Sequence, residues 1–305
     1  MTVRRTPLIT RPLTRRSALL GGVGLAGLGL AACGSDGGSG SGGGTITLGY
    51  VPSWTDGLST AYLLQNRLET MGYTVEHQEI EQPAALYSAL ASGDIDIYPS
   101  AWPEVTHEKY MAEYGEDIED LATYYKNAVL TIAVPEYTDI TSIADLKGNA
   151  DMFGGKIYGI EPGAGLTGVT QDSMMPAYEL DGEYELVTSS TAAMLSELKK
   201  ATEAETDIVV TLWRPFWANS TFAVKDLEDP EGAMGETEGL HFLARPGFSE
   251  DFADAAEFIS GIALDDEQYG SLEDLVVNDY TDKEAEGVEK WLEENPDVLP
   301  AVEGE

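Results

Sequence analysis

The amino-acid sequence predicts an α/β protein whose folded part divides into two lobes. Stretches typical of strands alternate with stretches typical of helices between residues 45 and 295. Such alternation favours sheets of parallel strands covered by helices. The folded part has about 260 residues, whereas domains most often have roughly 100 to 150, so two lobes are expected rather than one.

The strands are predicted from short runs rich in apolar, β-branched and aromatic residues. They cover residues 45–51, 73–80, 95–98, 129–134, 156–160, 185–188 and 207–212. Helices are predicted at 58–71, which stops before Gly72, and at 83–91, which begins with proline. Residues 251–295 are predicted to be mostly helical, with many acidic residues outside the apolar positions.

The N-terminal segment indicates export. Residues 1–32 carry five arginines and no acidic residue, and they end in an apolar, Gly-rich run over 18–32. That run of about 15 residues is shorter than the roughly 20 that a membrane-spanning helix needs, so residues 1–32 are predicted to be a signal peptide. The Thr-Arg-Arg-Ser sequence at 14–17 is similar to a twin-arginine signal, although general secretory signals also hold paired arginines.

The end of this segment predicts a lipid anchor. Residues 30–33, Leu-Ala-Ala-Cys, resemble a bacterial lipobox, and Cys33 is the single cysteine of the chain. Residues 34–44 are nearly all Gly or Ser, which is typical of a flexible tether, so 33–44 are interpreted as a lipidated cysteine and its linker. We therefore expect an extracytoplasmic, membrane-anchored protein that folds without a disulfide.

The composition is strongly acidic. The chain has 17 Lys and Arg against 54 Asp and Glu, which gives a formal charge of −37. Such a surface argues against nucleic acid, whose phosphates require basic side chains, and against docking on anionic lipid headgroups. We expect no nucleic-acid partner and no cofactor, and solubility is the simplest explanation for the acidic excess.

Three of the five tryptophans, Trp54, Trp102 and Trp213, lie where predicted strands end. Ligands of α/β sheets bind beyond the carboxyl ends of the strands. A tryptophan face attracts a cation within about 6 Å, and a quaternary ammonium, which donates no hydrogen bond, is suited to several such faces. The three residues therefore predict an ammonium cage, although core packing alone would explain any one of them.

Other polar features near these loops suit a ligand carboxylate. Residues 163–166 open a predicted helix, whose first amides would bind an anion, although such a turn is often only a turn. His107 would donate an N–H, and Arg214 would bind the carboxylate or pair with a neighbouring acid. Asp56 would influence the site electrostatically or cap its loop. The histidines lack the spacing of a zinc site, so no metal is expected.

Seven stretches together resemble the glycine-betaine-binding proteins of ABC transporters, over nearly the full mature chain. They are 49–57, 100–102 with His107, 144–147, 155–165, 189–195, 211–217 and 227–230. The resemblance implies a two-lobed, type II periplasmic-binding-protein fold with the ligand cleft between the lobes. It also implies that 45–133 and 241–305 form lobe 1 and that 134–240 form lobe 2.

The resemblance further implies a function: a monomeric, non-enzymatic importer subunit that delivers a betaine to an ABC permease for osmoprotection. Three side chains would cage the trimethylammonium, namely Trp54, Trp102 and Trp213. One side chain and two backbone amides would hold the carboxylate, namely His107, Gly165 and Leu166. Trp217 and Trp291 are interpreted as structural.

The sequence departs from the family pattern in two places. Trp102 is followed directly by Pro103 and Glu104, where the family has Trp-Leu-Pro. Arg214 and Phe216 stand where the family has threonine and histidine. Arg214 would then hold the carboxylate of a longer betaine or of another compatible solute.

Three alternatives remain open from the sequence. The same fold would bind choline or an ectoine-like solute instead of a betaine. A secreted hydrolase would use carboxylates such as Asp56 and Glu104, but the sequence holds no recognisable nucleophile motif or metal spacing. A structural surface lipoprotein would lack a cleft between its lobes.

Overall fold

The computed structural model describes residues 43–302. All of them belong to one compact unit, Ser41–Glu305. The predicted signal peptide, Cys33 and most of the Gly/Ser tether lie outside the described residues. Among the described residues, no helix combines the length and the apolar character that crossing a bilayer requires.

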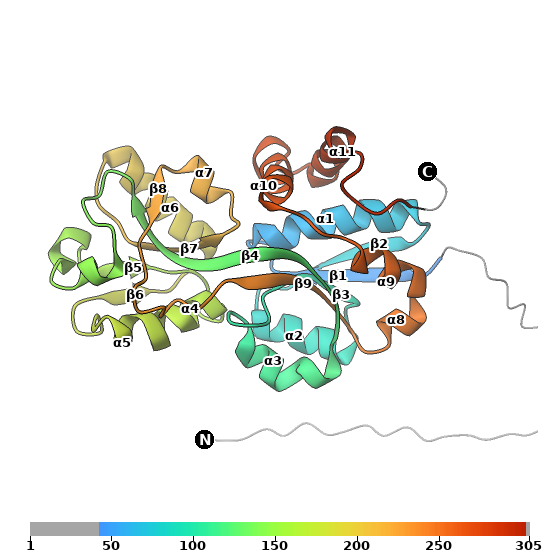
Figure 1. Cartoon of the computed structure of the whole chain (residues 1–305), viewed down its shortest axis with the longest axis horizontal. Helices are drawn as coiled ribbons and strands as arrows, with labels where there is room; N and C mark the ends of the chain where they lie inside the picture. Colours follow the sequence, from blue (N-terminus) through green and yellow to red (C-terminus); the bar gives the residue numbers. More distant parts are fainter. Residues whose placement is uncertain (1–42, 303–305) are drawn as a thin grey trace, which may run out of the picture. The chain divides into compact units, whose positions relative to one another are not determined.

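The first half of the unit alternates strands and helices (Figure 1). Its elements are β1 (Thr45–Tyr50), α1 (Thr55–Thr70), β2 (Thr74–Glu79), α2 (Pro83–Ser92), β3 (Ile97–Ala101) and α3 (Glu108–Tyr114). The local sequence explains α2, because Pro83 occupies its first turn and Gly93 ends it in the left-handed region at φ 79°. The predicted helices at 58–71 and 83–91 are confirmed to within a few residues.

Two long strands connect the halves of the unit, as Figure 1 shows for β4 (Glu119–Pro135) and β9 (Glu238–Ala244). β4 pairs antiparallel with β9 as far as Ala128, and with β7 (Val210–Arg214) from Val129 onward. The sequence predicted only the apolar end of β4 at 129–134 and missed β9. The first part of β4 is rich in polar residues, which hides it from a search for apolar runs.

The second half holds shorter strands. Its elements are β5 (Lys156–Tyr158), α4 (Gly165–Val169), α5 (Met175–Ala177), β6 (Glu185–Val187), α6 (Thr191–Ala204), β7, α7 (Ala218–Thr221) and β8 (Val224–Asp226). β9 then returns the chain to the first half. Four α-helices and a π-helical turn at Leu275–Asp279 follow it in the described residues, which confirms the predicted helical region. The α-helices are α8 (Phe248–Asp251), α9 (Ala253–Ser260), α10 (Asp266–Asp274) and α11 (Glu284–Glu294).

The strands form one sheet path in the order β2-β1-β3-β9-β4-β7-β5-β6, with β8 paired to β4. β1 is parallel to β2 and β3, and β5 is parallel to β6 and β7. The predicted parallel pairing is confirmed for these strands, whereas β4 and β9, which the prediction did not include as a pair, lie antiparallel to their neighbours. These two strands carry the chain between the halves directly, whereas a parallel neighbour would need a crossover connection.

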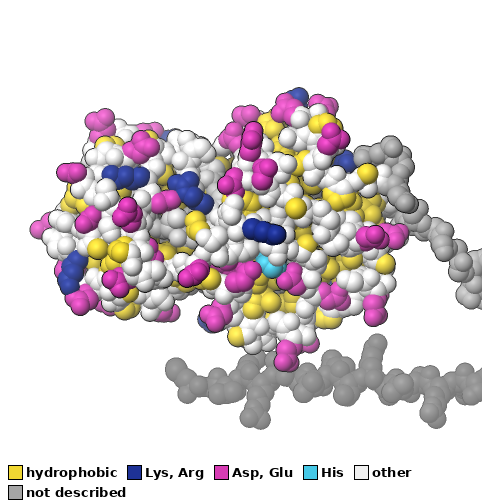
Figure 2. Space-filling model, in the orientation of Figure 1, with side chains coloured by type: hydrophobic (Ala, Val, Ile, Leu, Met, Phe, Trp, Pro, Cys, Tyr) yellow, Lys and Arg dark blue, Asp and Glu magenta, His cyan; other side chains and the backbone are white. Residues whose placement is uncertain are grey.

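Side-chain burial separates structural residues from surface residues. Trp291 of α11 is fully buried and its indole N–H donates to the Ser271 hydroxyl at 2.9 Å, which confirms its structural role. On the face drawn in Figure 2, acidic side chains are spread widely and the few basic ones are scattered.

Candidate ligand-binding site

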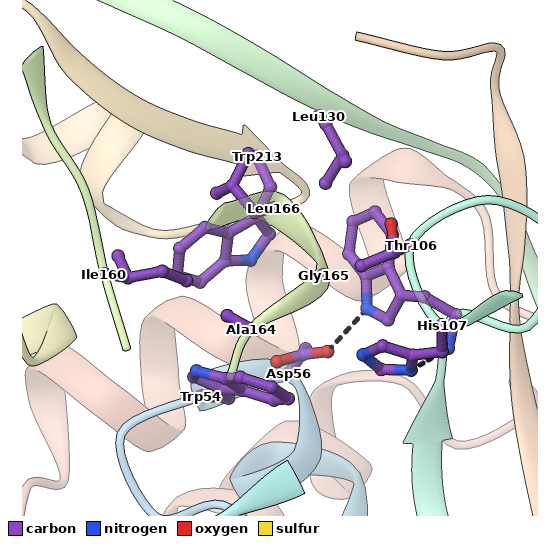
Figure 3. Close-up of a pocket in the computed structure, with 11 residues that line it drawn as sticks. Trp54, Asp56, Thr106, His107, Leu130, Ile160, Ala164, Gly165, Leu166 and Trp213 are labelled. Atoms are coloured by element: carbon purple, nitrogen blue, oxygen red, sulfur yellow. Dashed lines mark hydrogen bonds between the residues drawn. The ribbon is translucent and has the colours of Figure 1, made fainter. Parts of the chain in front are cut away.

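One pocket gathers residues from both halves of the unit (Figure 3). It contains the six residues that the family resemblance assigned to the cage and to the carboxylate, together with Asp56. The lining consists of Trp54, Asp56, Trp102, Thr106, His107, Leu130, Ile160, Ala164, Gly165, Leu166 and Trp213. The cavity among them has a volume of about 30 Å³.

Three indole rings form the aromatic walls of this pocket. Trp54 precedes α1, Trp102 follows β3 and Trp213 lies near the end of β7, and all three are more than nine-tenths buried. Hydrogen bonds hold two of the rings by their edges: Trp102 Nε1 donates to Asp56 Oδ2 at 3.0 Å, and Trp54 Nε1 donates to Glu161 Oε2 at 3.3 Å. Their N–H groups are thus used within the protein rather than left for a ligand.

The imidazole of His107 is a neutral hydrogen-bond donor. Its Nδ1 accepts the backbone N–H of Trp102 at 3.1 Å and lies 2.9 Å from the Tyr87 hydroxyl. Burial lowers the pKa of His107 to about 3, because the charged ring would be poorly solvated. The proton of the neutral ring therefore resides on Nε2, the nitrogen that faces the pocket in Figure 3. His107 also stacks on Trp54, with ring centroids 5.9 Å apart.

Backbone amides provide a second set of donors. Gly165 and Leu166 are the first two residues of α4, and the first amides of a helix have no partner within it. A Cβ atom at Gly165 would lie only 1.8 Å from the carbonyl oxygen of Thr106. Glycine is therefore required here, because it lets this loop pack directly against the loop that carries His107.

Asp56 places a carboxylate beside the aromatic walls. It is 3 % exposed, and its Oδ2 accepts hydrogen bonds from the Ser100 hydroxyl at 2.7 Å and from the Trp102 indole. Burial raises the pKa of Asp56, while the two hydrogen bonds oppose that change by stabilising the anion. The Tyr124 hydroxyl supports the arrangement by donating to Ser100 at 2.8 Å.

Two of the predicted modifiers lie elsewhere. Arg214 pairs with Asp226 at 2.5 Å and lines a second cavity, which also contains Phe216 and Trp217. Phe216 does not line the pocket. Its ring stacks on the ring of Trp213, with centroids 3.9 Å apart. The structure therefore does not bring either side chain to the pocket.

Glu104, the second carboxylate of the hydrolase alternative, does not line the pocket that contains Asp56. Its carboxylate accepts the Gly239 backbone N–H at 3.2 Å and lies 3.0 Å from His241 Nε2. The part of the chain that the structure describes holds no group of three or more His, Cys, Asp or Glu residues arranged for a metal ion.

Three lining residues received no role from the sequence, namely Thr106, Leu130 and Ile160. Ala164 lies within residues 163–166, which the sequence assigned to a helix start. Glu161, which accepts the hydrogen bond of the Trp54 indole, also received no role. Ile160 and Glu161 follow β5, so their place after a strand end was the available signal. Leu130 lies inside β4 and carries no such signal.

Comparison with known proteins relates this architecture to one family. Residues 44–294 match the family model described as the substrate-binding domain of the ABC-type glycine betaine transport system. The chain is 38 % identical over 143 residues to the glycine betaine/carnitine transport binding protein GbuC of Listeria monocytogenes. That alignment covers 47 % of the chain and 47 % of GbuC, so it spans about half of this curated relative.

Solved structures extend the similarity to nearly the whole described region. The glycine betaine/L-proline-binding protein ProX of Borrelia burgdorferi is 32 % identical, with a TM-score of 0.78 over 84 % of this chain and 97 % of that one. Lactococcal OpuAC, closed and complexed with glycine betaine, is 26 % identical, with a TM-score of 0.77 over 83 % and 97 %. A choline-binding protein with choline gives 25 % and 0.75, over 83 % and 89 %. The predicted two-lobed periplasmic-binding-protein fold is confirmed.

A buried carboxyl group borders the loop of Trp54. Glu273 of α10 is 2 % exposed and accepts a hydrogen bond from the Thr55 hydroxyl. Burial, with a smaller contribution from the charge of Asp56, raises the pKa of Glu273 to about 8. An ordinary glutamate has a pKa near 4.3. The folded protein therefore retains a proton that the unfolded chain has released.

The Glu273→Gln variant is expected to change how stability depends on pH. Since the folded-state pKa is raised, wild-type stability should fall as pH rises from about 4.5 through about 8, and the penalty should be complete above that range. The neutral amide removes this penalty, so the variant should be a few kcal/mol more stable than wild type at pH 9 and similar at pH 4.5. Urea unfolding at both pH values measures the difference.

Glu267→Gln provides the matched control, because Glu267 lies on the same helix and is exposed. Its stability difference from wild type should be small and independent of pH. Equal pH profiles for wild type and Glu273→Gln would contradict the raised pKa.

Proposed function

The chain belongs to the family of substrate-binding domains of ABC-type glycine betaine transport systems, and from that premise we propose that it binds glycine betaine in the pocket between its lobes. The observation that carries the proposal is the meeting of three tryptophans, a neutral histidine donor and two helix-start amides around one cavity. Aromatic faces suit the trimethylammonium, and N–H donors suit the carboxylate. The pocket thus offers complementary chemistry to both ends of a zwitterion.

In the proposed complex the ammonium contacts the faces of Trp54, Trp102 and Trp213. The carboxylate accepts hydrogen bonds from His107 Nε2 and from the amides of Gly165 and Leu166. Because Trp54, Trp102 and His107 belong to the first lobe and the remaining groups to β7 and α4, the ligand would contact both lobes and favour the closed arrangement.

The position of Arg214 favours a compact ligand. This side chain does not line the pocket and is paired with Asp226 outside it. A longer betaine with its carboxylate on Arg214 would need that ion pair to break and the side chain to turn. Glycine betaine requires neither change and is the preferred candidate.

Choline is the second candidate, and Asp56 is the observation that favours it. A buried carboxylate beside the cage offsets a net positive charge on the ligand. Choline carries such a charge and no carboxylate, so it would use the Asp56 side of the pocket more than His107. A related solved structure is described as a choline-binding protein with choline bound.

We also propose the organisation in which this site works. Lobe 1 would comprise 45–133 with 241–305, and lobe 2 would comprise 134–240. The partner change along β4, from β9 to β7 after Ala128, and the return through β9 support two crossings between lobes within a few residues of these bounds. We further propose that the protein is exported, is a monomer and is anchored through Cys33. It would pass the unaltered solute to an ABC permease. The predicted signal peptide and the lipobox-like segment support export and anchoring, and the transport family supports delivery to a permease.

Replacing each cage residue, as Trp54→Ala, Trp102→Ala or Trp213→Ala, is expected to raise the Kd for glycine betaine at least about 30-fold. A desolvated cation–π contact is worth about 2 kcal/mol or more, and 1.4 kcal/mol corresponds to a factor of ten. Isothermal titration calorimetry over glycine betaine, proline betaine, carnitine, choline and ectoine measures the affinities. Trp217→Ala, outside the pocket, should bind as wild type does.

No binding of any quaternary ammonium by wild type would reject the proposed function. Unchanged affinities in all three cage variants would remove these rings from the site while leaving the family assignment intact.

Two further variants separate a betaine receptor from a choline receptor. His107→Ala should weaken glycine betaine binding about tenfold or more, because a hydrogen bond to a charged group contributes about 1.5 to 3 kcal/mol, and should change choline binding little. Asp56→Asn should weaken choline more than glycine betaine. The same calorimetric titrations test both, and the opposite pattern would favour choline as the ligand.

A further inference from the structure

Four hydrogen-bond donors converge on the carboxylate of Glu161, which follows β5 in the second lobe. Thr191 of the same lobe donates its backbone N–H to Oε1 at 3.0 Å and its hydroxyl to Oε2 at 2.9 Å. From the first lobe, the Ser53 hydroxyl donates to Oε1 at 3.0 Å and Trp54 Nε1 donates to Oε2 at 3.3 Å. Each carboxylate oxygen therefore accepts one hydrogen bond from each lobe.

The two bonds within the second lobe fix the direction of this carboxylate. Thr191 is the first residue of α6, whose N-terminus favours a negative charge. Ser190 caps that helix separately by accepting the Ala193 backbone N–H, so Glu161 is not needed as its capping residue. With its direction set by Thr191, the carboxylate meets Ser53 and Trp54 only when the lobes are together.

Neighbouring contacts bring the same loop against the first lobe. The Tyr110 hydroxyl donates to the carbonyl oxygen of Gly163 at 2.7 Å. The chain at Gly165 packs so closely on Thr106 that a side chain there would collide with its carbonyl. Those contacts hold this loop against the first lobe. In contrast, one of the hydrogen bonds that Glu161 accepts comes from a ring of the cage itself.

We propose that Glu161 is a positioning residue that joins lobe closure to the cage by holding the Trp54 indole in place. The proposal rests on the proposed function. A ligand lying against Trp54 would leave only after the hydrogen bonds from Ser53 and Trp54 to Glu161 had broken. Glu161 would thus prolong the bound state without touching the ligand, and it would affect dissociation more than association.

Glutamine cannot replace this carboxylate. In the Glu161→Gln variant, both orientations of the side-chain amide would place its NH₂ group against an N–H donor, either the Trp54 indole or the Thr191 backbone amide. The hydroxyls of Ser53 and Thr191 can reverse their roles and accept, but the two N–H groups cannot. Glu161→Gln keeps the size of the side chain and must still lose at least one of the four bonds.

Stopped-flow tryptophan fluorescence of the full-length chain with glycine betaine tests the proposal. Glu161→Gln should raise the dissociation rate constant at least tenfold and change the association rate constant less than about threefold, as expected for a loss that acts on the bound state. Glu185→Gln, an exposed position of the same lobe, is the matched control and should leave both rate constants unchanged. Small-angle scattering should show less ligand-induced compaction for Glu161→Gln than for wild type.

Ser53→Ala adds a measurement that a purely structural role of Glu161 would leave unchanged. Ser53 does not line the pocket, and its removal should speed dissociation severalfold in wild type but hardly at all in the Glu161→Gln background. Independent, additive effects of the two substitutions would overturn the proposal, as would a wild-type dissociation rate in Glu161→Gln.

If Glu161→Gln fails to fold, Ser53→Ala alone decides: unchanged dissociation would overturn the proposal, and faster dissociation at an unchanged melting temperature of the ligand-free protein would support it. If wild type binds no quaternary ammonium, the proposed function itself fails, and this inference fails with it. Binding by wild type with unaltered kinetics in the variants rejects the inference alone.

Discussion

Close packing between the loop after β5 and the first lobe is the interaction on which the pocket depends. Gly165 approaches the carbonyl of Thr106 too closely for any side chain, and Glu161 receives hydrogen bonds from Ser53 and Trp54. Without this contact the three tryptophans would not surround one volume, because Trp213 belongs to β7 and the other two to loops of the first lobe. In the structure the aromatic walls, the helix-start amides and the histidine therefore form one site across this contact.

Desolvation sets the chemistry within that site. Burial keeps His107 neutral and thereby makes it a donor at Nε2, and it disfavours the charge on Asp56. Outside the pocket, burial also holds Glu273 protonated near neutral pH. The same exclusion of water strengthens the attraction of an indole face for a cation. A site lined by acids alone would retain water around its charges, so the aromatic rings are what suit the pocket to a quaternary ammonium.

The sequence predicted the two-lobed α/β fold and the three tryptophans that meet in the pocket, because strands, turns and tryptophans at strand ends carry local signals. Family resemblance, rather than spacing, supplied the pairing of His107 with Gly165 and Leu166. The antiparallel pairing of β4 with β9 went unpredicted, since polar residues mask the first part of β4. Arg214 does not bind at the pocket because it pairs with Asp226. The two residues lie on separate strands, β7 and β8, so sequence spacing does not reveal which acid Arg214 pairs with.

Nuclear Overhauser effects between the N-methyl protons of glycine betaine and the protein test the central claim most directly. The account predicts cross-peaks from these methyl groups to the ring protons of Trp54, Trp102 and Trp213, and a changed resonance of the His107 Nε2–H proton in the same complex. Tight binding with cross-peaks to other residues, and with none of the three indoles, would contradict it.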